Sequence, residues 1–361
     1  MKIAIIDADL IGSTKHRFPN LVCMKLSGYY KELGNEVVLK TNYDNLEQYD
    51  KVFISKVFTD TPVEKEVLKL SNVEYGGTGF FYDKAPKLPI EIEHHMPDYH
   101  LYDEWVNEKI DNGRKRTDFK YYLDYSIGFI TRGCFRQCSF CVNQNYKKVE
   151  IHSPLNEFLD PNRKKICLLD DNFFGCPSWK KLLLELQSIG KPFQFKQGLD
   201  ERLLTDDKCE LLFKSKYDGD YIFAFDNIED YELIKSKLIL LRKYTDKYPK
   251  FYVFCGFDRN NKWDSSFWEQ DIFDMMKRIE LLMEHHCIPY IMRFNRYIES
   301  RYSGVYKTVA AWCNQPSFFK KKSLREFGEI SGVNSARNKY IIEFEKEFPD
   351  FKKYMNMRWK R

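Results

Sequence analysis

Several features that mark membrane and exported proteins are missing from this sequence. No uninterrupted apolar run approaches the ~18–20 residues that a membrane helix needs. The first stretch, MKIAIIDADLIG, places Asp7 and Asp9 where a signal peptide requires apolar residues. Internal repeats and low-complexity segments are also missing. We therefore expect a soluble cytoplasmic protein that has no membrane partner.

The sequence also lacks a strong excess of one charge. Its 361 residues carry a formal net charge of +5, and 43% of them are hydrophobic and 31% charged. These fractions exclude a disordered or collagen-like chain, and the length predicts about two domains. Residues 320–361 nevertheless hold twelve Lys or Arg against six Asp or Glu. The stretches 319–322 and 357–361 mix cations with aromatic rings, as nucleic-acid contacts do, although a solvated helical end has the same pattern.

Short apolar runs alternate with helical patterns along most of the chain. The runs predicted to be strands are 2–7, 36–40, 51–55, 126–131, 165–170, 192–197, 221–226, 251–256 and 288–294. Helical patterns cover 22–33, 62–70 and 178–190. The alternation predicts an α/β fold, with a Rossmann-like open parallel sheet followed by a partial (β/α)6 TIM-type barrel and a helical C-terminal extension.

The same patterns divide the chain into segments. We expect a Rossmann-like domain at 1–100, a linker at 101–124, the partial barrel at 125–310 and the basic helical extension at 311–361. Prolines and charged residues between 83 and 124 predict a connector that lies over the surface. Because ligand loops follow the carboxyl ends of parallel strands, the functional residues are expected at those ends.

Ten cysteines are unusual in a chain of this kind, because a reducing compartment disfavours disulfides. Cys134, Cys138 and Cys141 stand at i, i+4 and i+7, so they can converge on one metal centre. Structural zinc needs a fourth ligand, and the only nearby one, His152, gives a spacing unlike the usual zinc patterns. An iron–sulfur cube held by three thiolates instead keeps one iron open. The other cysteines are predicted to be buried core thiols, with an auxiliary cluster left open: Cys23, Cys167, Cys176, Cys209, Cys255, Cys287 and Cys313.

The arrangement Cys134-x3-Cys138-x-Phe140-Cys141 resembles the hallmark of the radical S-adenosylmethionine (SAM) superfamily. The resemblance implies that the three thiolates bind a [4Fe–4S] cluster, with Phe140 behind it, and that the open iron chelates SAM. In that family, one-electron reduction cleaves SAM to a 5′-deoxyadenosyl radical, which usually abstracts a substrate hydrogen. It therefore also implies an external electron donor such as flavodoxin or ferredoxin.

The resemblance continues through polar residues at successive strand ends between 125 and 300. The family often has Gly-Gly-Glu after the second barrel strand, and this chain has Leu168-Leu169-Asp170-Asp171-Asn172 there instead. The residues that the resemblance suggests for SAM binding are Asp170, Asp171, Asn172, Gln197, Asp200, Arg202, Asp226, Gly256, Asp258 and Arg293. For each of them, loop capping or a salt bridge is the competing interpretation.

The first hundred residues resemble the cobalamin-binding-like domain that precedes the barrel in one branch of the superfamily. Asp9 and Gly12, then 55–57, then 76–77, follow that branch's pattern. The position of its cobalt-binding histidine is Ile11, and His16 is expected to be a surface loop residue. Either cobalamin binds without a protein histidine, or the domain keeps the fold without the cofactor.

The leading hypothesis is therefore a radical SAM enzyme that modifies an unidentified substrate, nucleic acid or peptide, by hydrogen abstraction or by methyl transfer through cobalamin. One alternative is the same enzyme with a degenerate N-terminal domain and no cobalamin. The other is a non-catalytic, metal-dependent nucleic-acid-binding protein that uses the cysteine loop and the basic tail. The pairs His94-His95 and His285-His286 are not expected to bind metal, because adjacent side chains point in different directions.

Overall fold

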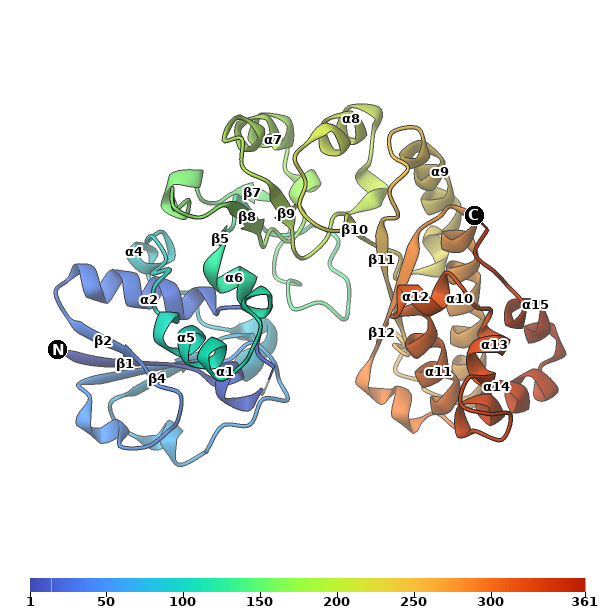
Figure 1. The fold of residues 1–361 in the computed structure, drawn as a ribbon, viewed down its shortest axis with the longest axis horizontal. Coiled ribbons are helices and arrows are strands. Elements are labelled where there is room, and N and C mark those ends of the chain that lie inside the picture. The colour runs from blue at the N-terminus through green and yellow to red at the C-terminus, as the bar shows by residue number, and fades with distance from the viewer. Residues whose placement is uncertain (14, 361) are drawn as a thin grey trace. The chain divides into compact units, whose positions relative to one another are not determined.

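The chain forms two compact units, Met1–Lys196 and Gln197–Arg361, and both have an α/β architecture with parallel sheets (Figure 1). This computed structural model describes residues 1–13 and 15–360. The predicted α/β class is confirmed. None of the described helices has the length and apolarity that crossing a membrane requires.

The first unit begins with a four-stranded parallel sheet in the order β2-β1-β3-β4 (Figure 1, blue). Its strands are β1 (Lys2–Asp7), β2 (Glu36–Leu39), β3 (Lys51–Ser55) and β4 (Val73–Gly76). Helix α1 (Ala8–Gly12) follows β1, α2 (Leu21–Glu32) packs on the sheet, and α3 (Thr78–Phe81) follows β4. Strand β1 is central and its apolar side chains are buried, which is why this run was recognisable in the sequence.

One predicted helix in this region is wrong. Residues 62–70 form only a single 3-10 turn, Val67–Lys69, before β4 begins. Of this turn, only Val67 is buried, and it packs with the β1 and β3 side chains. Val63, Leu68 and Leu70 pack on the same core but are only partly buried, so the segment buries little apolar surface that would stabilise a longer helix.

The prediction that 83–124 lies over the surface is also wrong. The segment carries α4 (Ile90–Glu93), α5 (Asp103–Asp111) and α6 (Lys120–Leu123). Its Tyr99, Tyr102, Val106, Phe119 and Tyr122 are buried in one core with β1 and α2. The prolines and charges that suggested a connector lie between these apolar positions.

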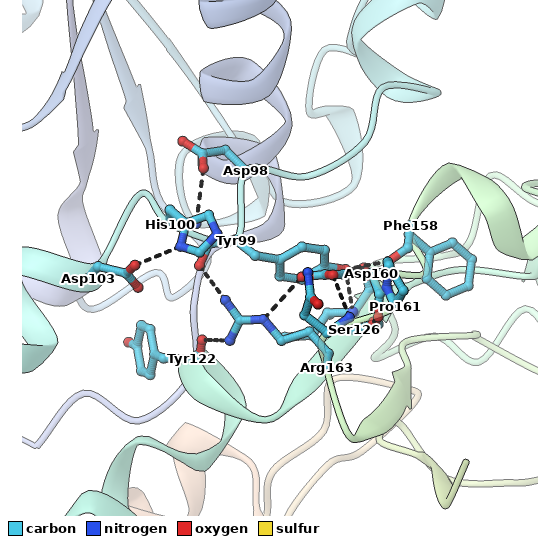
Figure 2. A network of polar contacts seen from close by, with 12 residues as sticks. Asp98, Tyr99, His100, Asp103, Tyr122, Ser126, Phe158, Asp160, Pro161 and Arg163 are labelled. Atoms are coloured by element: carbon cyan, nitrogen blue, oxygen red, sulfur yellow. Dashed lines mark hydrogen bonds and ion pairs between the residues drawn. The ribbon is translucent and has the colours of Figure 1, made fainter. Parts of the chain in front are cut away.

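A polar network fixes this segment to the rest of the first unit (Figure 2). The buried Arg163 guanidinium donates to the backbone carbonyls of Tyr99, at 2.6 Å, and of Tyr122. The Tyr99 hydroxyl donates to the Phe158 carbonyl at 2.6 Å and accepts from the Ile127 N–H at 2.8 Å. Since Ile127 belongs to a strand of the next sheet, the helical segment is part of the core that supports that sheet.

The second sheet of this unit is parallel, in the order β5-β8-β9. Its strands are β5 (Tyr125–Gly128), β8 (Lys165–Leu168) and β9 (Phe193–Phe195). Helix α7 (Trp179–Ser188) lies between β8 and β9 in the chain. A short antiparallel pair, β6 (Thr131–Arg132) and β7 (Glu150–Ile151), closes the base of the long excursion that contains the three clustered cysteines.

The second unit contains the parallel sheet β10-β11-β12. The strands are β10 (Ile222–Ala224), β11 (Lys250–Cys255) and β12 (Ile288–Arg293). The helices are α8 (Asp206–Lys214), α9 (Tyr231–Arg242), α10 (Ser265–Glu284), α11 (Ser303–Cys313), α12 (Pro316–Phe319), α13 (Leu324–Glu329), α14 (Ala336–Glu347) and α15 (Lys352–Met355). The C-terminal helices cover the β12 edge, where Asn314 bonds to both the N–H and the carbonyl of Ile291.

Candidate metal centre

The cysteine loop leaves the β5 end of the sheet and returns through β7. At its start, Gly133 has φ +99, and a Cβ at this position would lie 2.3 Å from the Lys148 carbonyl oxygen. Only glycine fits such a close approach at a positive φ. Glycine directly before Cys134 therefore has a structural reason, namely the closure of the loop's two arms.

Two acidic residues after β8 hold both arms of this loop. The buried Asp170 carboxylate accepts hydrogen bonds from the Thr131 N–H at 2.7 Å and the Thr131 hydroxyl at 2.6 Å. Asp171 accepts from the Gly133 N–H and from the Asn143 side-chain amide, both at 2.8 Å. One carboxylate thus bridges the residue before Cys134 and a residue just after Cys141.

The Asp170 carboxyl is buried, which disfavours its charged form. Burial raises its pKa to about 7, and the three hydrogen bonds from Ile130 and Thr131 oppose that rise. Both carboxylates had been predicted as SAM contacts. The contacts described instead support the loop, and their role toward SAM stays a prediction.

The sulfurs of Cys134 and Cys141 receive hydrogen bonds. Cys134 Sγ accepts from the Arg136 N–H and from the Asn172 side-chain amide, each at 3.5 Å, and Cys141 Sγ accepts from the Asn143 N–H at 3.4 Å. Such donors stabilise thiolate charge and tune iron–sulfur clusters. The chemistry of the donor set therefore fits a thiolate-bound cluster.

The loop thiols differ from the other seven cysteines in burial. Cys134, Cys138 and Cys141 are half-buried, whereas Cys23, Cys167, Cys176, Cys209, Cys255, Cys287 and Cys313 are all buried. Burial raises the pKa of the Cys23, Cys255 and Cys287 thiols, which keeps them protonated. The prediction of core thiols at the seven positions is confirmed. Within residues 1–13 and 15–360, no three His, Cys, Asp or Glu side chains are gathered as a preformed metal site.

His152, the one candidate for a fourth zinc ligand, is engaged elsewhere. Its Nε2 lies 3.3 Å from the Glu93 carboxylate, its Nδ1 lies 3.0 Å from the Ser153 hydroxyl, and its ring stacks on His94. Burial raises the pKa of Glu93, but hydrogen bonds and charge from His152 and Lys25 outweigh it and lower that pKa to about 2. His152 therefore belongs to an ion-pair network.

The remaining predicted SAM contacts lie in the second unit. Gln197 is exposed, and Arg202 is shared by the carboxylates of Asp200, at 2.7 Å, and Asp230, at 2.9 Å. These ion pairs raise the pKa of Arg202 although burial lowers it. The Arg202 fork is thus already paired with carboxylates of this chain.

The other strand-end residues of this unit join backbone segments. Asp226 accepts from the Phe254 N–H at 3.0 Å, and Asp258 accepts from the Asn260 N–H at 3.1 Å. The Gly256 N–H donates to Asp271, and the exposed Arg293 guanidinium stacks 4.5 Å from the Tyr297 ring centroid. These residues lie at strand ends as predicted, and their binding of SAM stays a prediction.

The residues after the carboxyl end of β1 bear on the cobalamin pattern. Asp9 accepts from the Val57 N–H at 2.7 Å and from the Thr61 hydroxyl, so the loops after β1 and β3 are tied together. Ile11 is partly buried and packs against the core of the sheet. These residues are compatible with two arrangements: cobalamin bound without a histidine ligand from the protein, or a domain that binds no cobalamin. Both arrangements stay predictions.

His16 is not a surface residue, contrary to expectation. Its side chain is 10% exposed, and its Nδ1 lies 2.5 Å from the Tyr122 hydroxyl. Burial lowers the pKa of His16 to about 4. The ring is covered because Tyr122 comes from the segment that had been predicted to lie outside the core.

The basic C-terminal tail makes contacts within the second unit. Lys320 Nζ lies 3.9 Å from the Tyr248 ring centroid, the Trp359 ring packs 5.4 Å from the same ring, and Arg358 pairs with Glu326. These cations and rings are therefore engaged by the protein itself. A nucleic-acid partner stays a prediction, and Arg361 lies outside the described residues.

Sequence reasoning missed the residues that hold the cysteine loop from outside it. Asn143 follows Cys141 by two positions, and its turn-forming side chain was a usable local signal. Tyr82, whose hydroxyl donates to the Phe140 carbonyl at 2.8 Å, carries no signal that links it to the loop. Neither a scan against family models nor a search of curated proteins finds a match to this chain.

Proposed function

We propose that this protein is a radical SAM enzyme in which Cys134, Cys138 and Cys141 hold a [4Fe–4S] cluster. The observation that carries the proposal is a loop of three half-buried thiols in the spacing Cys-x3-Cys-x-Phe-Cys, with N–H donors on two of the sulfurs. When bound and reduced, such a cluster supplies the electron that cleaves SAM to a 5′-deoxyadenosyl radical. The proposal includes an external electron donor such as flavodoxin or ferredoxin.

The chain's own residues prepare the loop for this role. Asp171 fixes both arms of the loop through Gly133 and Asn143, so that the intervening thiols are carried on a closed segment. Asn172 donates to the sulfur of Cys134 and would hold that thiolate in its charged form. The antiparallel pair β6 and β7 holds the base of the loop.

The proposed architecture is finer than the α/β class. Each unit contributes one three-stranded parallel sheet, β5-β8-β9 and β10-β11-β12, and we propose that they represent the strands of a partial (β/α)6 barrel. The preceding order β2-β1-β3-β4 agrees with the start of the flavodoxin-like doubly wound sheet, whose ligands bind at the β1/β3 switch point. A cobalamin-binding-like domain is therefore proposed for residues 1–100.

The reaction class follows from whether cobalamin is present. With cobalamin the proposal includes methyl transfer, and without it the reaction is hydrogen abstraction. The packing of Ile11 and the contacts of Asp9 favour a domain that does not ligate cobalt through histidine. An absorbance spectrum after incubation with cobalamin and removal of unbound cofactor distinguishes the two.

Anaerobic reconstitution of the full chain tests the proposed cluster. We expect about four irons per chain, the content of one [4Fe–4S] cube, and an electron paramagnetic resonance signal of the reduced cluster that changes when SAM is added. The matched control replaces Cys134, Cys138 and Cys141 with alanine and should bind no cluster. A colourless wild-type protein that binds zinc instead would overturn the proposal.

A further inference from the structure

The segment after β4 reaches the cysteine loop from the first sheet. Gly77 there has φ +105, and a Cβ at this position would lie 2.3 Å from the Lys56 carbonyl oxygen. The Gly79 N–H donates to the same oxygen at 2.9 Å. The segment is thus packed tightly over the residue that follows β3, which makes it a firm extension of the first sheet.

Tyr82, at the end of this segment, has a backbone conformation that non-glycine residues rarely adopt. Its φ is 50 and its ψ is −112. Conformations of this kind are strained and persist where surrounding contacts impose them. The ring is 43% exposed, so filling the hydrophobic core does not account for the conformation.

Two hydrogen bonds connect this position to the cysteine loop. The Tyr82 hydroxyl donates to the Phe140 carbonyl oxygen, and the Asn145 side-chain amide donates to the Asp83 carbonyl oxygen, both at 2.8 Å. Phe140 directly precedes Cys141, and Asn145 follows it by four residues. The two bonds therefore flank Cys141, and they add to the bond by which Asp171 holds Asn143 in the same arm of the loop.

We propose that Tyr82 is a positioning residue for Cys141, through which the N-terminal sheet orients the cysteine loop. This inference rests on the proposed function, because it assigns to residues 1–100 a part in building the cluster site. The Tyr82 hydroxyl donates to a backbone carbonyl, so it acts on the loop through Phe140. Its effect is to hold Phe140 and thereby the Cys141 side of the loop.

The test compares Tyr82→Phe with wild type and with Tyr75→Phe in the full-length chain. Tyr75 is a matched control, because it lies in the same region, is 40% exposed and stacks on Phe81. In the iron-free protein, limited alkylation with iodoacetamide followed by mass spectrometry gives the ratio of modification at Cys141 to that at Cys134. Losing one hydrogen bond should raise the ratio about three- to fivefold in Tyr82→Phe and leave it unchanged in Tyr75→Phe.

Asn145→Ala should raise the same ratio, because it removes the second hydrogen bond beside Cys141. An unchanged ratio in both Tyr82→Phe and Asn145→Ala, or an equal rise at Cys134 and the buried Cys167, would overturn the inference. After reconstitution, Tyr82→Phe should keep the wild-type iron content but alter the resonance spectrum of the reduced cluster, which loss of stability alone would not do. Because alkylation needs no cluster, a failure of the wild type to bind iron counts against the proposed function separately.

Discussion

Acidic side chains lie near the carboxyl ends of parallel strands in both units, but the segments to which they hydrogen-bond differ. In the first unit, Asp170 and Asp171 accept N–H groups from the arms of a long loop that carries three half-buried thiols. In the second, Asp226 and Asp271 accept N–H groups at the ends of β11, next to the buried Arg278. The first arrangement supports an excursion of the chain. The second ties the end of β11 to the neighbouring β10, through Asp226, and to α10, through Asp271.

The difference shows why residue type and strand position are insufficient to assign a role. Asp at a strand end is equally compatible with a ligand contact, a loop support and a strand connection. Only the partners distinguish them, and these partners lie about 25 to 40 residues away in sequence. The comparison therefore predicts different consequences for substitutions that look alike in the sequence.

The largest expected effect is the difference in iron binding between a substitution at a loop thiol and one at a core thiol. Cys138→Ala should abolish iron binding on reconstitution and barely change the free energy of unfolding of the iron-free protein, since the side chain is half-buried. Cys167→Ala should keep about four irons and lose roughly 1–2 kcal/mol of stability, because it leaves a small cavity in the core. Iron analysis measures cluster binding, and urea unfolding measures stability. Equal iron loss in both variants would contradict the distinction between loop thiols and core thiols.

Arg278→Met should be the most damaging change to the second unit. The Arg278 guanidinium donates to the carbonyls of Phe225, Asp226 and Phe254, and its side chain is 2% exposed. Its removal leaves buried acceptors unpaired, so we expect the free energy of unfolding to fall by about 3–5 kcal/mol. The exposed pair Arg259–Glu229 supplies the control, because Arg259→Met should cost less than about 1 kcal/mol. Similar losses in both would contradict the role assigned to Arg278.

Asp171→Ala should weaken the cluster without removing a ligand. Supporting residues around a metal typically change its affinity by roughly 10- to 100-fold. We expect a loss of that size in iron retention against a chelator, and a smaller loss for Asp171→Asn, whose oxygen still accepts from the Gly133 N–H. Wild-type retention in Asp171→Ala would contradict this role, because the other contacts of the loop would then hold it without Asp171.

The smallest expected effect is a pH dependence of stability that arises from Asp7, the last residue of β1. Burial raises the pKa of Asp7 to about 7, opposed by the hydrogen bond from Tyr102 and assisted by the charge of Asp9. Folding therefore retains a proton that the unfolded chain releases, so this contribution to stability is present at low pH and is lost as pH rises through 7. Between pH 6 and 8 the loss is about 1 kcal/mol.

Asp7→Asn isolates this contribution. The nearby His16 works in the opposite sense, because burial lowers its pKa to about 4 and the unfolded chain binds the proton more readily. The contribution of His16 is present in both wild type and Asp7→Asn, so it cancels when their free energies of unfolding are subtracted. The stability of wild type relative to Asp7→Asn, from urea unfolding, should fall from pH 6 to pH 8; a constant difference would contradict the assignment.

Much of the framework could be predicted because it depends on local pattern. Buried strands such as β1 and β11 appear as short apolar runs, and the three loop cysteines are recognisable from spacing alone. The segment 83–124 was misjudged because its prolines and charges hid seven buried apolar positions spread over its short helices and the turns between them. Composition reports the average character of such a segment, whereas packing depends on which side chains face the sheet.

The supports of the candidate site could not be predicted for a related reason. Asp171 was identified as functional, but its bonds to Gly133 and Asn143 depend on how β8 lies beside β5. Tyr82 and Phe140 are 58 residues apart, and no periodicity connects them. Contacts between distant segments are set by the register of the sheets and become visible only in the folded chain.

The central claim is that the cysteine loop activates SAM, and release of 5′-deoxyadenosine tests it most directly. The reconstituted wild type, incubated anaerobically with SAM and dithionite, should release 5′-deoxyadenosine together with methionine, while the variant without the three loop cysteines should release none. A wild-type protein that retains about four irons per chain but cleaves no SAM would contradict the account.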